Sequence, residues 1–257
     1  MMARAARLAT LLEELVVDGR IDVEESAARH QVSAATIRRD LDYLADQHLL
    51  SRTHGGAVPN TVSYDLPLRY KATSRGDAKK RIARRATQML WPGCTLALNG
   101  GTTTTEIARA IPAVHALNNG VTVITNAINI ATELAVRPFI KILVSGGVAR
   151  PQTYELVGPI ASETLSRLTP DLCFLGATGV DLLAGVTCDD EAEAAVNRVM
   201  VQHAKRTLVV ADSAKLGAVG FSQICRLTEV AGVLTDDGAD PAAVQSLTDS
   251  GVEVLVA

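Results

Sequence analysis

The stretch that most constrains the fold of this chain runs from Val32 to Val58 and reads VSAATIRRDLDYLADQHLLSRTHGGAV. Ser33 is a favourable N-cap, because its hydroxyl can accept a hydrogen bond from a free amide in the first turn of a helix. An apolar stripe follows at spacings of four, three and four residues: Ile37, Leu41, Leu44 and His48. Because this spacing is that of one helix face, an amphipathic helix is predicted to begin after Ser33.

The face opposite the stripe carries side chains suited to reading DNA. On a helical wheel, Ala35 and Arg39 point directly away from the stripe, and Thr36 and Arg38 lie on its flanks. A helix that enters the major groove by its N-terminal end would present five side chains: Ser33, Ala35, Thr36, Arg38 and Arg39. That orientation keeps the acidic residues of the later turns away from phosphates, and it is how recognition helices dock.

Two adjacent arginines on an amphipathic helix are, by themselves, more typical of a solvated face. The flanking sequence favours the DNA-binding interpretation. Asp22 and Glu25 give a D-x-x-E helix start, which opens a short helix through His30. Only a few residues separate that helix from Ser33, which is the length of the turn in a helix-turn-helix unit.

The sequence after the predicted recognition helix indicates a wing. Leu49 and Leu50 lead into Ser-Arg-Thr-His-Gly-Gly-Ala, which reads as a strand with a Gly-Gly turn. We therefore expect Arg52, His54 and Gly55 to lie where a wing touches the sugar–phosphate backbone of DNA.

These stretches together resemble the N-terminal signature of the DeoR family of bacterial transcriptional regulators. The resemblance is carried by VSAATIRRDLDYL followed by RTHGGAV, which is a long and specific motif. It departs from the usual pattern mainly in the turn, where His30 and Gln31 stand at positions that vary within the family. The resemblance implies that the N-terminal domain binds double-stranded operator DNA.

Length and charge limit how such a chain could bind DNA. At 257 residues it is long enough for two domains, and its net charge of −3 argues against a basic coat over the whole surface. Acidic residues slightly outnumber Lys and Arg over residues 1–57, whereas residues 69–85 contain eight Lys and Arg and one acid, Asp77. Affinity for DNA is therefore expected from local arginines and from this basic segment.

The composition gives no indication of a metal site, a cofactor or a membrane segment. Four widely spaced cysteines form no C-x-x-C pair and read as buried, reduced thiols: Cys94, Cys173, Cys188 and Cys225. Residues Met2–Asp18 read as an amphipathic helix interrupted by charges rather than as a signal peptide. No apolar run approaches the roughly 20 residues that span a bilayer. We expect a soluble, cytoplasmic protein without cofactor or metal.

The pattern after residue 58 predicts a linker and then an α/β domain. The winged domain is predicted to cover residues 1–58, the linker to cover residues 59–76 and the second domain to cover residues 77–257. The second domain is predicted to begin with a basic amphipathic helix over Asp77–Leu90. Strands are predicted at seven apolar runs: Thr95–Leu98, Val121–Thr125, Lys141–Ser145, Leu172–Gly176, Thr207–Ala211, Val230–Thr235 and Val252–Val256. Helices are predicted between them: Thr103–Ala110, Ala127–Ala135, Ile160–Leu168, Glu191–Lys205 and Pro241–Thr248. This alternation implies an open, mostly parallel sheet.

Glycine-rich and polar sequence follows most of these strands, and ligands of such sheets bind at the carboxyl ends of the strands. Glycines, helix-start amides and hydroxyls that could cradle an anion follow the first strand: Asn99, Gly100, Gly101, Thr102, Thr103 and Thr104. Further candidates follow the later strands: Asn126, Gly146, Gly147, Arg150, Gly176, Asp181, Gly185, Asp212 and Lys215. Lys215 would supply a charge for phosphate, and Asn126 and Asp212 could hydrogen-bond hydroxyls. The ends together predict a site for one small polyhydroxylated anion.

The same loops resemble the C-terminal domain of the DeoR family, so the likeness extends over nearly the whole chain. The family's D-S-G-T-T-T, T-N-S and D-S-S-K-F-G motifs appear as residues 99–104, 125–127 and 212–217. The resemblance implies a fold related to ribose-5-phosphate isomerase and glucosamine-6-phosphate deaminase, and a domain that senses phosphorylated sugars or related metabolites. Asn99 replaces a carboxylate and Ala127 a hydroxyl, which leaves the identity of the ligand open.

A sugar-phosphate isomerase or deaminase with a DNA-binding appendage is the alternative to a sensor. Leu175 and Thr178 stand where the isomerase motif has its carboxylates, and neither side chain can act as a general base. Nearby acids keep the enzymatic alternative open: Asp181, Asp189, Asp190, Glu191 and Glu193. A winged-helix module that binds protein is a third possibility, because residues 1–57 are not basic. We predict a regulator without catalytic activity, with repression as the family tendency, acting as a homo-oligomer that pairs two DNA half-sites.

Overall fold

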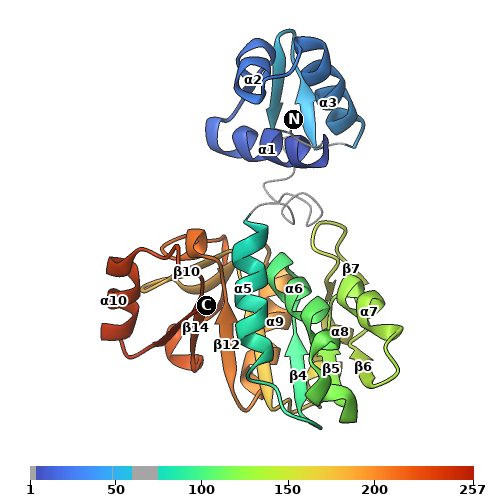
Figure 1. Cartoon of the computed structure of the whole chain (residues 1–257), viewed down its shortest axis with the longest axis vertical. Helices are drawn as coiled ribbons and strands as arrows, with labels where there is room; N and C mark the ends of the chain where they lie inside the picture. Colours follow the sequence, from blue (N-terminus) through green and yellow to red (C-terminus); the bar gives the residue numbers. More distant parts are fainter. Residues whose placement is uncertain (1–3, 48, 60–74) are drawn as a thin grey trace. The chain divides into compact units, whose positions relative to one another are not determined.

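The computed structural model describes residues 4–47, 49–59 and 75–257, and contacts divide the chain into two units, residues 1–74 and 75–257. Figure 1 shows both units, and each is described by itself. Most of the predicted linker, residues 59–76, and His48 of the predicted apolar stripe lie outside the described residues. Among the described helices, none has both the length and the apolar character required to cross a membrane.

The N-terminal unit is a winged helix-turn-helix. Its helices are α1 (Arg4–Asp18), α2 (Val23–His30) and α3 (Ala34–Asp46), and its strands are β1 (Ile21–Asp22), β2 (Leu50–Arg52) and β3 (Gly56–Pro59). The predicted N-caps are confirmed, because Asp22 accepts the amides of Glu24 and Glu25 and Ser33 accepts that of Thr36. Gln31 ends α2 in the left-handed conformation, with φ 54°.

The sheet of this unit has the order β1-β3-β2, and the sequence did not predict β1. Its short pairing with β3 places Ile21 opposite Ala57 and Asp22 opposite Gly56. A Cβ atom at Gly56 would lie 1.7 Å from the carbonyl oxygen of Ile21, so only glycine permits this approach.

A buried ion pair fastens α1 to α3 in the core of the wing domain. Ile37, Leu41 and Leu44 are fully buried, as their spacing predicted. Asp40 is only 2% exposed, and its carboxylate pairs with Nε of Arg7 at 2.6 Å and with Nε of Arg4 at 3.2 Å. This link was not predicted, because its partners lie more than 30 residues apart in the sequence.

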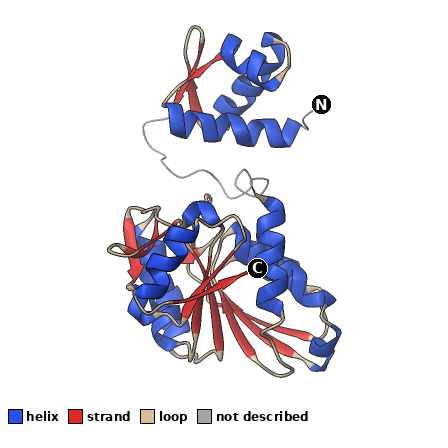
Figure 2. Cartoon of the chain, turned by 60° about the vertical axis from the view of Figure 1, so that its left-hand side comes forward, coloured by secondary structure: helices blue, strands red, loops and turns tan. Residues whose placement is uncertain are grey.

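The C-terminal unit is built on a seven-stranded, all-parallel sheet with the order β15-β14-β12-β9-β4-β5-β6 (Figure 2). The strands confirm the seven predicted runs to within two residues at each end: β4 (Thr95–Leu98), β5 (Val121–Thr125), β6 (Ile140–Val144), β9 (Leu172–Gly176), β12 (Thr207–Val210), β14 (Gly232–Thr235) and β15 (Glu253–Val256). The predicted open α/β architecture is therefore confirmed.

Helices cover both faces of this sheet. One face carries α5 (Gly76–Thr87), α6 (Thr102–Ala110) and α7 (Ile128–Ala135), which pack on alternate strand residues such as Leu96 and Leu98. The other face packs on residues such as Ala97 and carries the remaining helices: α8 (Pro159–Ser166), α9 (Glu191–His203) and α10 (Pro241–Asp249). Short 3-10 turns lie at Ile111–Ala113, His115–Asn119, Ser213–Lys215 and Leu227–Glu229.

Two small antiparallel sheets were missed by the sequence analysis. One is the hairpin of β7 (Val148–Ala149) and β8 (Leu156–Val157). The other has the order β10-β11-β13 and comprises Gly179–Asp181, Gly185–Cys188 and Ser222–Cys225. The four cysteines are buried and form no disulfide, as predicted.

Candidate functional site

The N-terminal end of α3 is the part of the wing domain that matches a DNA-reading surface. Ala35, Arg38 and Arg39 are exposed there, and Thr36 is half-buried. Ser33 accepts the Thr36 amide at 3.2 Å, and the two hydroxyls lie 2.9 Å apart. The structure therefore brings all five predicted recognition side chains to one helix end.

The two arginines of this surface differ in their present contacts. Arg38 pairs with Glu24 of α2 at 3.0 Å, and both side chains are exposed. Arg39 lines a small hollow beside Arg4, Arg7 and the buried Asp40, and it makes no ion pair within the described residues. Arg39 is exposed, and of the two arginines it is the one that no described acid pairs with.

The wing holds one of its predicted DNA contacts internally. Nε of Arg52 donates to Asp42 of α3 at 2.9 Å, and an Nη1 of Arg52 donates to the carbonyl of Gly56 at 2.5 Å. These bonds hold the wing against α3, so Arg52 has a structural role in the wing. His54 and Gly55 are exposed in the turn between β2 and β3.

In the second unit, the carboxyl ends of the seven parallel strands lie at one edge of the sheet. This edge brings together the segments that follow β4, β5, β6, β9 and β12, which contain most of the predicted ligand residues: Asn99 to Thr104, Asn126, Gly146, Gly147, Gly176, Asp212 and Lys215. We call it the strand-end edge.

Asn99 holds two of these segments together. Its Nδ2 donates to the carbonyl of Gly176 at 3.0 Å, and its Oδ1 accepts the amide of Gly176 at 2.7 Å. Asn99 is 2% exposed, and both polar atoms of its amide are bonded to the backbone of Gly176. An ionised aspartate could not donate the first of these bonds, which gives the asparagine at this position a structural role.

The glycine loop before α6 already holds an internal carboxyl group. The amide of Gly100 donates to Oε1 of Glu155 at 2.6 Å, and the side chain of Glu155 fills the space that a Cβ at Gly100 would need. Gly101 caps α6 without a side-chain acceptor, so the amides of its first turn face outward unsatisfied by a cap. The hydroxyl of Thr104 donates back to the carbonyl of Gly101 at 3.1 Å.

The three threonines that follow Gly101 differ in accessibility. Thr102 is half-buried, whereas Thr103 is 7% exposed and Thr104 is fully buried. An anion at the start of α6 would therefore meet the backbone amides and Thr102 before the two later hydroxyls.

Arg150 was predicted to bind an anionic ligand, and in the structure it forms ion pairs with acids of this chain. Its Nη1 lies 3.1 Å from Asp190 and 3.2 Å from Glu193. Gly146 and Gly147 have φ of 73° and 118°, and a Cβ at Gly147 would lie 2.7 Å from the carbonyl oxygen of Val157. Gly147 thus lets the chain pass close to β8, and Gly146 supplies the positive φ of the turn before it.

Asp212 and Lys215 belong to a turn fastened at the end of β12. Asp212 is 4% exposed and accepts the amide of Ala214 at 3.2 Å, and Lys215, which is half-buried, ends that turn. Asp236, after β14, accepts the amide of Ser213 at 2.7 Å. Burial raises the pKa of Asp236, but this bond and further hydrogen bonds outweigh burial and lower it.

Asp181 and Gly185 are not brought to the strand-end edge. They face each other across the turn between β10 and β11, at the end of this hairpin remote from Gly176. Asp181 accepts the amides of Leu183 and Ala184 at 2.8 Å, and these bonds lower its pKa. A Cβ at Gly185 would lie 2.4 Å from a carbonyl oxygen of β13. Both residues stabilise the hairpin.

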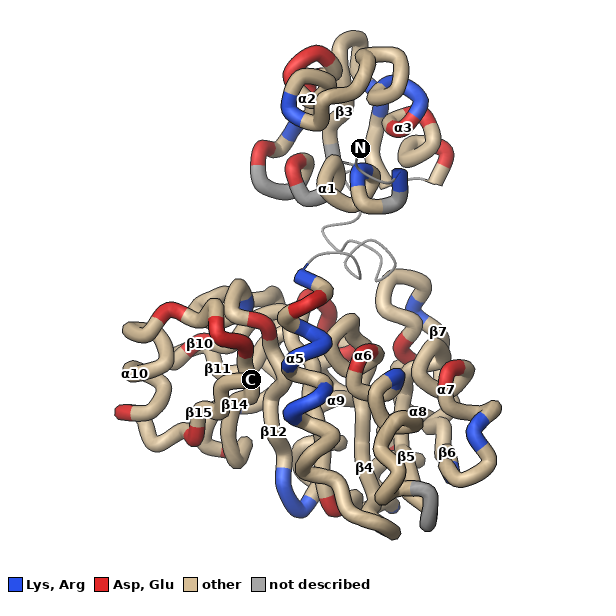
Figure 3. The backbone as a smooth tube through the Cα atoms, viewed as in Figure 1, with Lys and Arg blue, Asp and Glu red and all other residues tan. Residues whose placement is uncertain are grey.

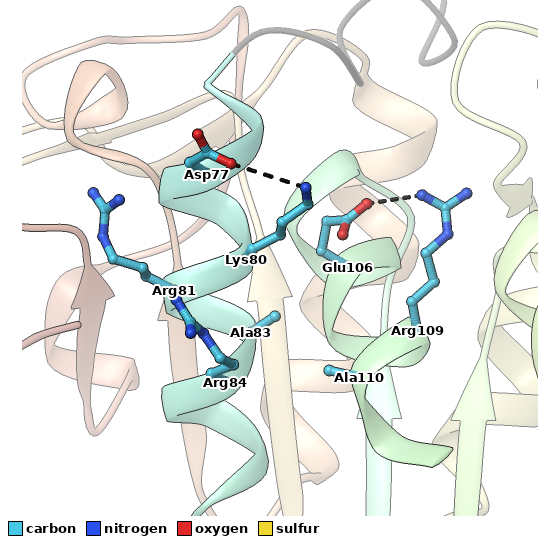
Figure 4. Close-up of a pocket in the computed structure, with 8 residues that line it drawn as sticks. All are labelled: Asp77, Lys80, Arg81, Ala83, Arg84, Glu106, Arg109 and Ala110. Atoms are coloured by element: carbon cyan, nitrogen blue, oxygen red, sulfur yellow. Dashed lines mark hydrogen bonds and ion pairs between the residues drawn. The ribbon is translucent and has the colours of Figure 1, made fainter. Parts of the chain in front are cut away.

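Helix α5 carries much of the positive charge of the second unit, as Figure 3 shows. Its first contacts reach the strand-end edge: Arg75, its N-cap, donates to Oγ of Ser213 at 2.9 Å, and Arg81 pairs with Asp237 at 2.5 Å. The groove between α5 and α6 (Figure 4) is lined by four cations and two acids, and Lys80–Asp77 and Arg109–Glu106 are paired within it.

Three buried polar residues at the strand-end edge were absent from the sequence prediction, Glu155, Asn197 and Asp236, and a fourth, Glu193, was considered only as a possible catalytic acid. Glu193 and Asn197 are four residues apart on the inward face of α9, beside Ala194 and Val201. Polar residues on an otherwise apolar helix face are a signal that the sequence analysis could have used. Glu155 gives no comparable signal.

Comparisons with known proteins agree with this geometry. A family model described as the DeoR-like helix-turn-helix domain matches residues 7–62, and one described as the DeoR C terminal sensor domain matches residues 74–237. The transcriptional regulator GlpR of Haloferax volcanii is 36% identical and matches over 94% of each chain. The transcriptional repressor GlcR of Bacillus subtilis is 34% identical over 99% of this chain and 97% of its own.

A putative aga operon transcriptional repressor of Escherichia coli O157:H7 is 31% identical over 96% of this chain and 91% of its own. Among solved structures, ribose 5-phosphate isomerase A of Methanocaldococcus jannaschii matches 55% of each chain at 16% identity and a TM-score of 0.41. The two domain models and the full-length relatives show that the chain belongs to the DeoR family of DNA-binding transcriptional regulators.

Proposed function

We propose that this regulator is a repressor of carbohydrate-metabolism genes and that a phosphorylated sugar or related metabolite controls it. The proposal is carried by the presence of two features in one chain. The first unit has an exposed helix end that bears arginines, and the second has a glycine-capped helix start and a lysine at its strand-end edge. A relative supports both repression and a phosphorylated effector: a glycerol-3-phosphate regulon repressor of Escherichia coli is 28% identical over 98% of this chain.

On the DNA side, α3 would enter the major groove of double-stranded operator DNA by its N-terminal end. Ala35, Thr36, Arg38 and Arg39 would reach base edges or phosphates, with Ser33 closing the turn before them. The wing would contribute Arg52, His54 and Gly55 to the sugar–phosphate backbone. Because one such helix reads few bases, we propose a homo-oligomer that pairs two half-sites.

On the effector side, the phosphate would bind the first-turn amides of α6 and the ammonium group of Lys215. A helix start attracts anions because its unsatisfied amides and the helix dipole both favour negative charge. Thr102 and Gly101 would line this position, since both are partly exposed while Thr104 is buried.

The site is proposed to bind its ligand without turning it over. Leu175 and Thr178 cannot ionise as carboxylates, and Asp181 lies in a hairpin turn remote from Gly176. Glu193 is engaged by Arg150 and by the hydroxyl of Thr153. A general base must be free to reach the substrate proton, which none of these groups satisfies.

The signal is proposed to pass through α5, the helix that follows the linker at residues 59–76. Arg75 and Arg81 join this helix to the segments after β12 and β14, next to Lys215. A ligand can shift DNA binding only if it binds the two arrangements with different affinity, and contacts of this kind are where that difference can arise.

An electrophoretic mobility shift on the DNA upstream of the protein's own gene tests the proposal. Sugar phosphates are added one at a time to the protein–DNA complex. Release of DNA by one phosphate ester, and by neither its dephosphorylated parent nor inorganic sulfate, is the expected result. A shift that no compound alters would contradict the effector class, and absence of any shift at low salt would contradict the operator assignment.

A further inference from the structure

A buried polar cluster lies directly beside the start of α6. Of its four residues, only Asn126 has been assigned to ligand binding above. The cluster consists of Asn126 after β5, Glu155 before β8, and Glu193 and Asn197 of α9, which are 0%, 2%, 5% and 1% exposed. Nδ2 of Asn197 donates to Oε2 of Glu155 at 3.3 Å, while Oε1 of Glu155 accepts the Gly100 amide at 2.6 Å. Gly100 immediately precedes the N-cap of α6, so the cluster adjoins the proposed phosphate position.

The cluster has more hydrogen-bond acceptors than donors. Within the described part of the chain, Oδ1 of Asn126 and Oδ1 of Asn197 are buried and have no partner. A buried polar atom without a partner destabilises the folded state, so each oxygen favours an external donor. Both belong to side chains that surround the carboxyl group of Glu155.

The charge of the cluster is also one-sided. Arg150 is a cation beside it and forms ion pairs with Glu193 and Asp190. Burial raises the pKa of Glu155 well above its ordinary value, the charge of Glu193 adds to the rise, and hydrogen bonds from Gly100 and Asn197 oppose it. The surroundings therefore disfavour additional negative charge.

We propose that Asn126, Glu155 and Asn197 select an effector that offers hydrogen-bond donors next to its phosphate, and that they exclude phosphate esters that also carry a carboxylate. Hydroxyl or amino groups would satisfy the two unpaired amide oxygens and the carboxyl group. A ligand carboxylate adds a second negative charge and only hydrogen-bond acceptors. It would lose its bound water and face the amide oxygens of Asn126 and Asn197, which cannot donate hydrogen bonds to it. This selection rests on the phosphate site proposed above.

The test compares matched pairs of ligands on the full-length protein by isothermal titration calorimetry. In each pair one member has a carboxylate at C1 and the other does not: glucose 6-phosphate against 6-phosphogluconate, glycerol 3-phosphate against 3-phosphoglycerate, and glucosamine 6-phosphate against glucosaminate 6-phosphate. Inorganic phosphate is measured alongside. We expect the carboxylate-free member to bind at least tenfold more tightly in one or more pairs, and no pair to show the reverse.

A charge-removing variant ties that preference to the cluster. Glu155→Gln keeps the size and the acceptor for the Gly100 amide, but removes the ionisable group and adds two N–H donors. It is expected to reduce the discrimination within the pair at least threefold. Glu163→Gln removes an exposed carboxyl group of α8 and serves as the control, with discrimination unchanged.

The outcomes separate this proposal from the one on which it rests. If neither inorganic phosphate nor any ester binds, the phosphate site itself is contradicted. If phosphate binds and no pair shows a preference, or the carboxylate member binds more tightly, the selection is overturned. The comparison on the unmodified protein remains decisive if Glu155→Gln fails to fold, and an unchanged discrimination in a folded Glu155→Gln overturns the role of Glu155.

Discussion

At the scale of single residues, the strand-end edge separates side chains that build the site from those that can meet a ligand. The side-chain amide of Asn99 makes both of its hydrogen bonds to Gly176, whereas Lys215 ends a turn at the same edge and is half-buried. The sequence motif predicts the position of each residue along the chain. It does not predict the partner, because that partner comes from a distant segment.

Arg150 illustrates this limit. Its place after a Gly-Gly turn favoured an anion-binding role, and the structure pairs it with Asp190 and Glu193, some forty residues later. Glu155 was missed for the same reason, since its partner Gly100 lies 55 residues away. Buried polar pairs that join distant segments leave no periodic pattern in the sequence.

At this scale, Arg39→Ala is expected to weaken operator binding about tenfold, which corresponds to the cost of about 1–3 kcal/mol for one lost DNA contact. Fluorescence anisotropy of a labelled operator duplex measures the effect across salt concentrations. Effector binding should stay unchanged, because Arg39 lies in the other unit. Arg167→Ala, an exposed arginine of the second unit, is the control, and an equal loss of DNA affinity in both variants would refute the assignment.

The raised pKa of Glu155 predicts a pH dependence of stability. Because the folded state holds this proton more tightly than the unfolded state, stability falls as pH rises above the ordinary value of 4.5 towards the folded pKa. Glu155→Gln should lose this dependence, so its stability relative to the unmodified protein should improve from pH 5 to pH 7.5. Trp91, the single tryptophan, reports urea unfolding of the second unit by fluorescence. A stability difference that is constant with pH would contradict the burial of an ionisable Glu155.

At the scale of elements, apolar runs predicted all seven strands of the main sheet. The five inner strands are almost wholly buried and therefore read as continuous apolar runs, and the edge strands β6 and β15, although partly exposed, are still short aliphatic runs. The short strands could not be predicted in this way. β1 has two residues, and its pairing with β3 depends on the missing side chain at Gly56 rather than on an apolar pattern. The longer strands could therefore be predicted from the sequence, whereas short strands that depend on pairing with a distant segment could not.

Gly56→Ala is expected to break the β1–β3 pair and to abolish specific DNA binding, because its Cβ would overlap the carbonyl of Ile21. Gly76→Ala is the control, at a glycine outside the wing where a Cβ likewise meets no atom within 4 Å. Circular dichroism on heating and operator binding together measure both variants. Equal behaviour of the two would show that the wing does not need this close approach.

Helix α5 gives the second element-scale prediction. If Arg75 transmits the signal through Ser213, then Arg75→Ala should reduce the effect of the effector on DNA affinity by about 1 kcal/mol, within the range usual for coupling energies. Effector affinity itself should change less than twofold. Arg84→Ala, an exposed arginine of the same helix, should leave the coupling intact. Full coupling in Arg75→Ala would remove α5 from the proposed route.

At the scale of the whole molecule, function requires that two units with separate cores respond to each other. The wing domain packs around α1 and α3, and the sheet domain has a core on each of its two faces. Because the buried residues of the two units form separate clusters, binding of DNA and binding of effector are expected to be separable by mutation and joined only by linkage.

Oligomerisation belongs to the same scale. Val148 and Ile160 are 69% and 64% exposed near β6, which is an edge strand of the main sheet. Exposed apolar side chains beside an open sheet edge are typical of surfaces that a partner covers, and they support the proposed pairing of copies on two half-sites.

The measurement that tests the central claim most directly is operator affinity of the unmodified protein and of Lys215→Ala, each with and without the phosphate ester that releases DNA. The account predicts that the ester weakens operator binding of the unmodified protein at least tenfold, and that Lys215→Ala binds operator equally well and stays bound in its presence. Release of DNA from Lys215→Ala at the same ester concentration as from the unmodified protein would contradict control through a phosphate at the strand-end edge.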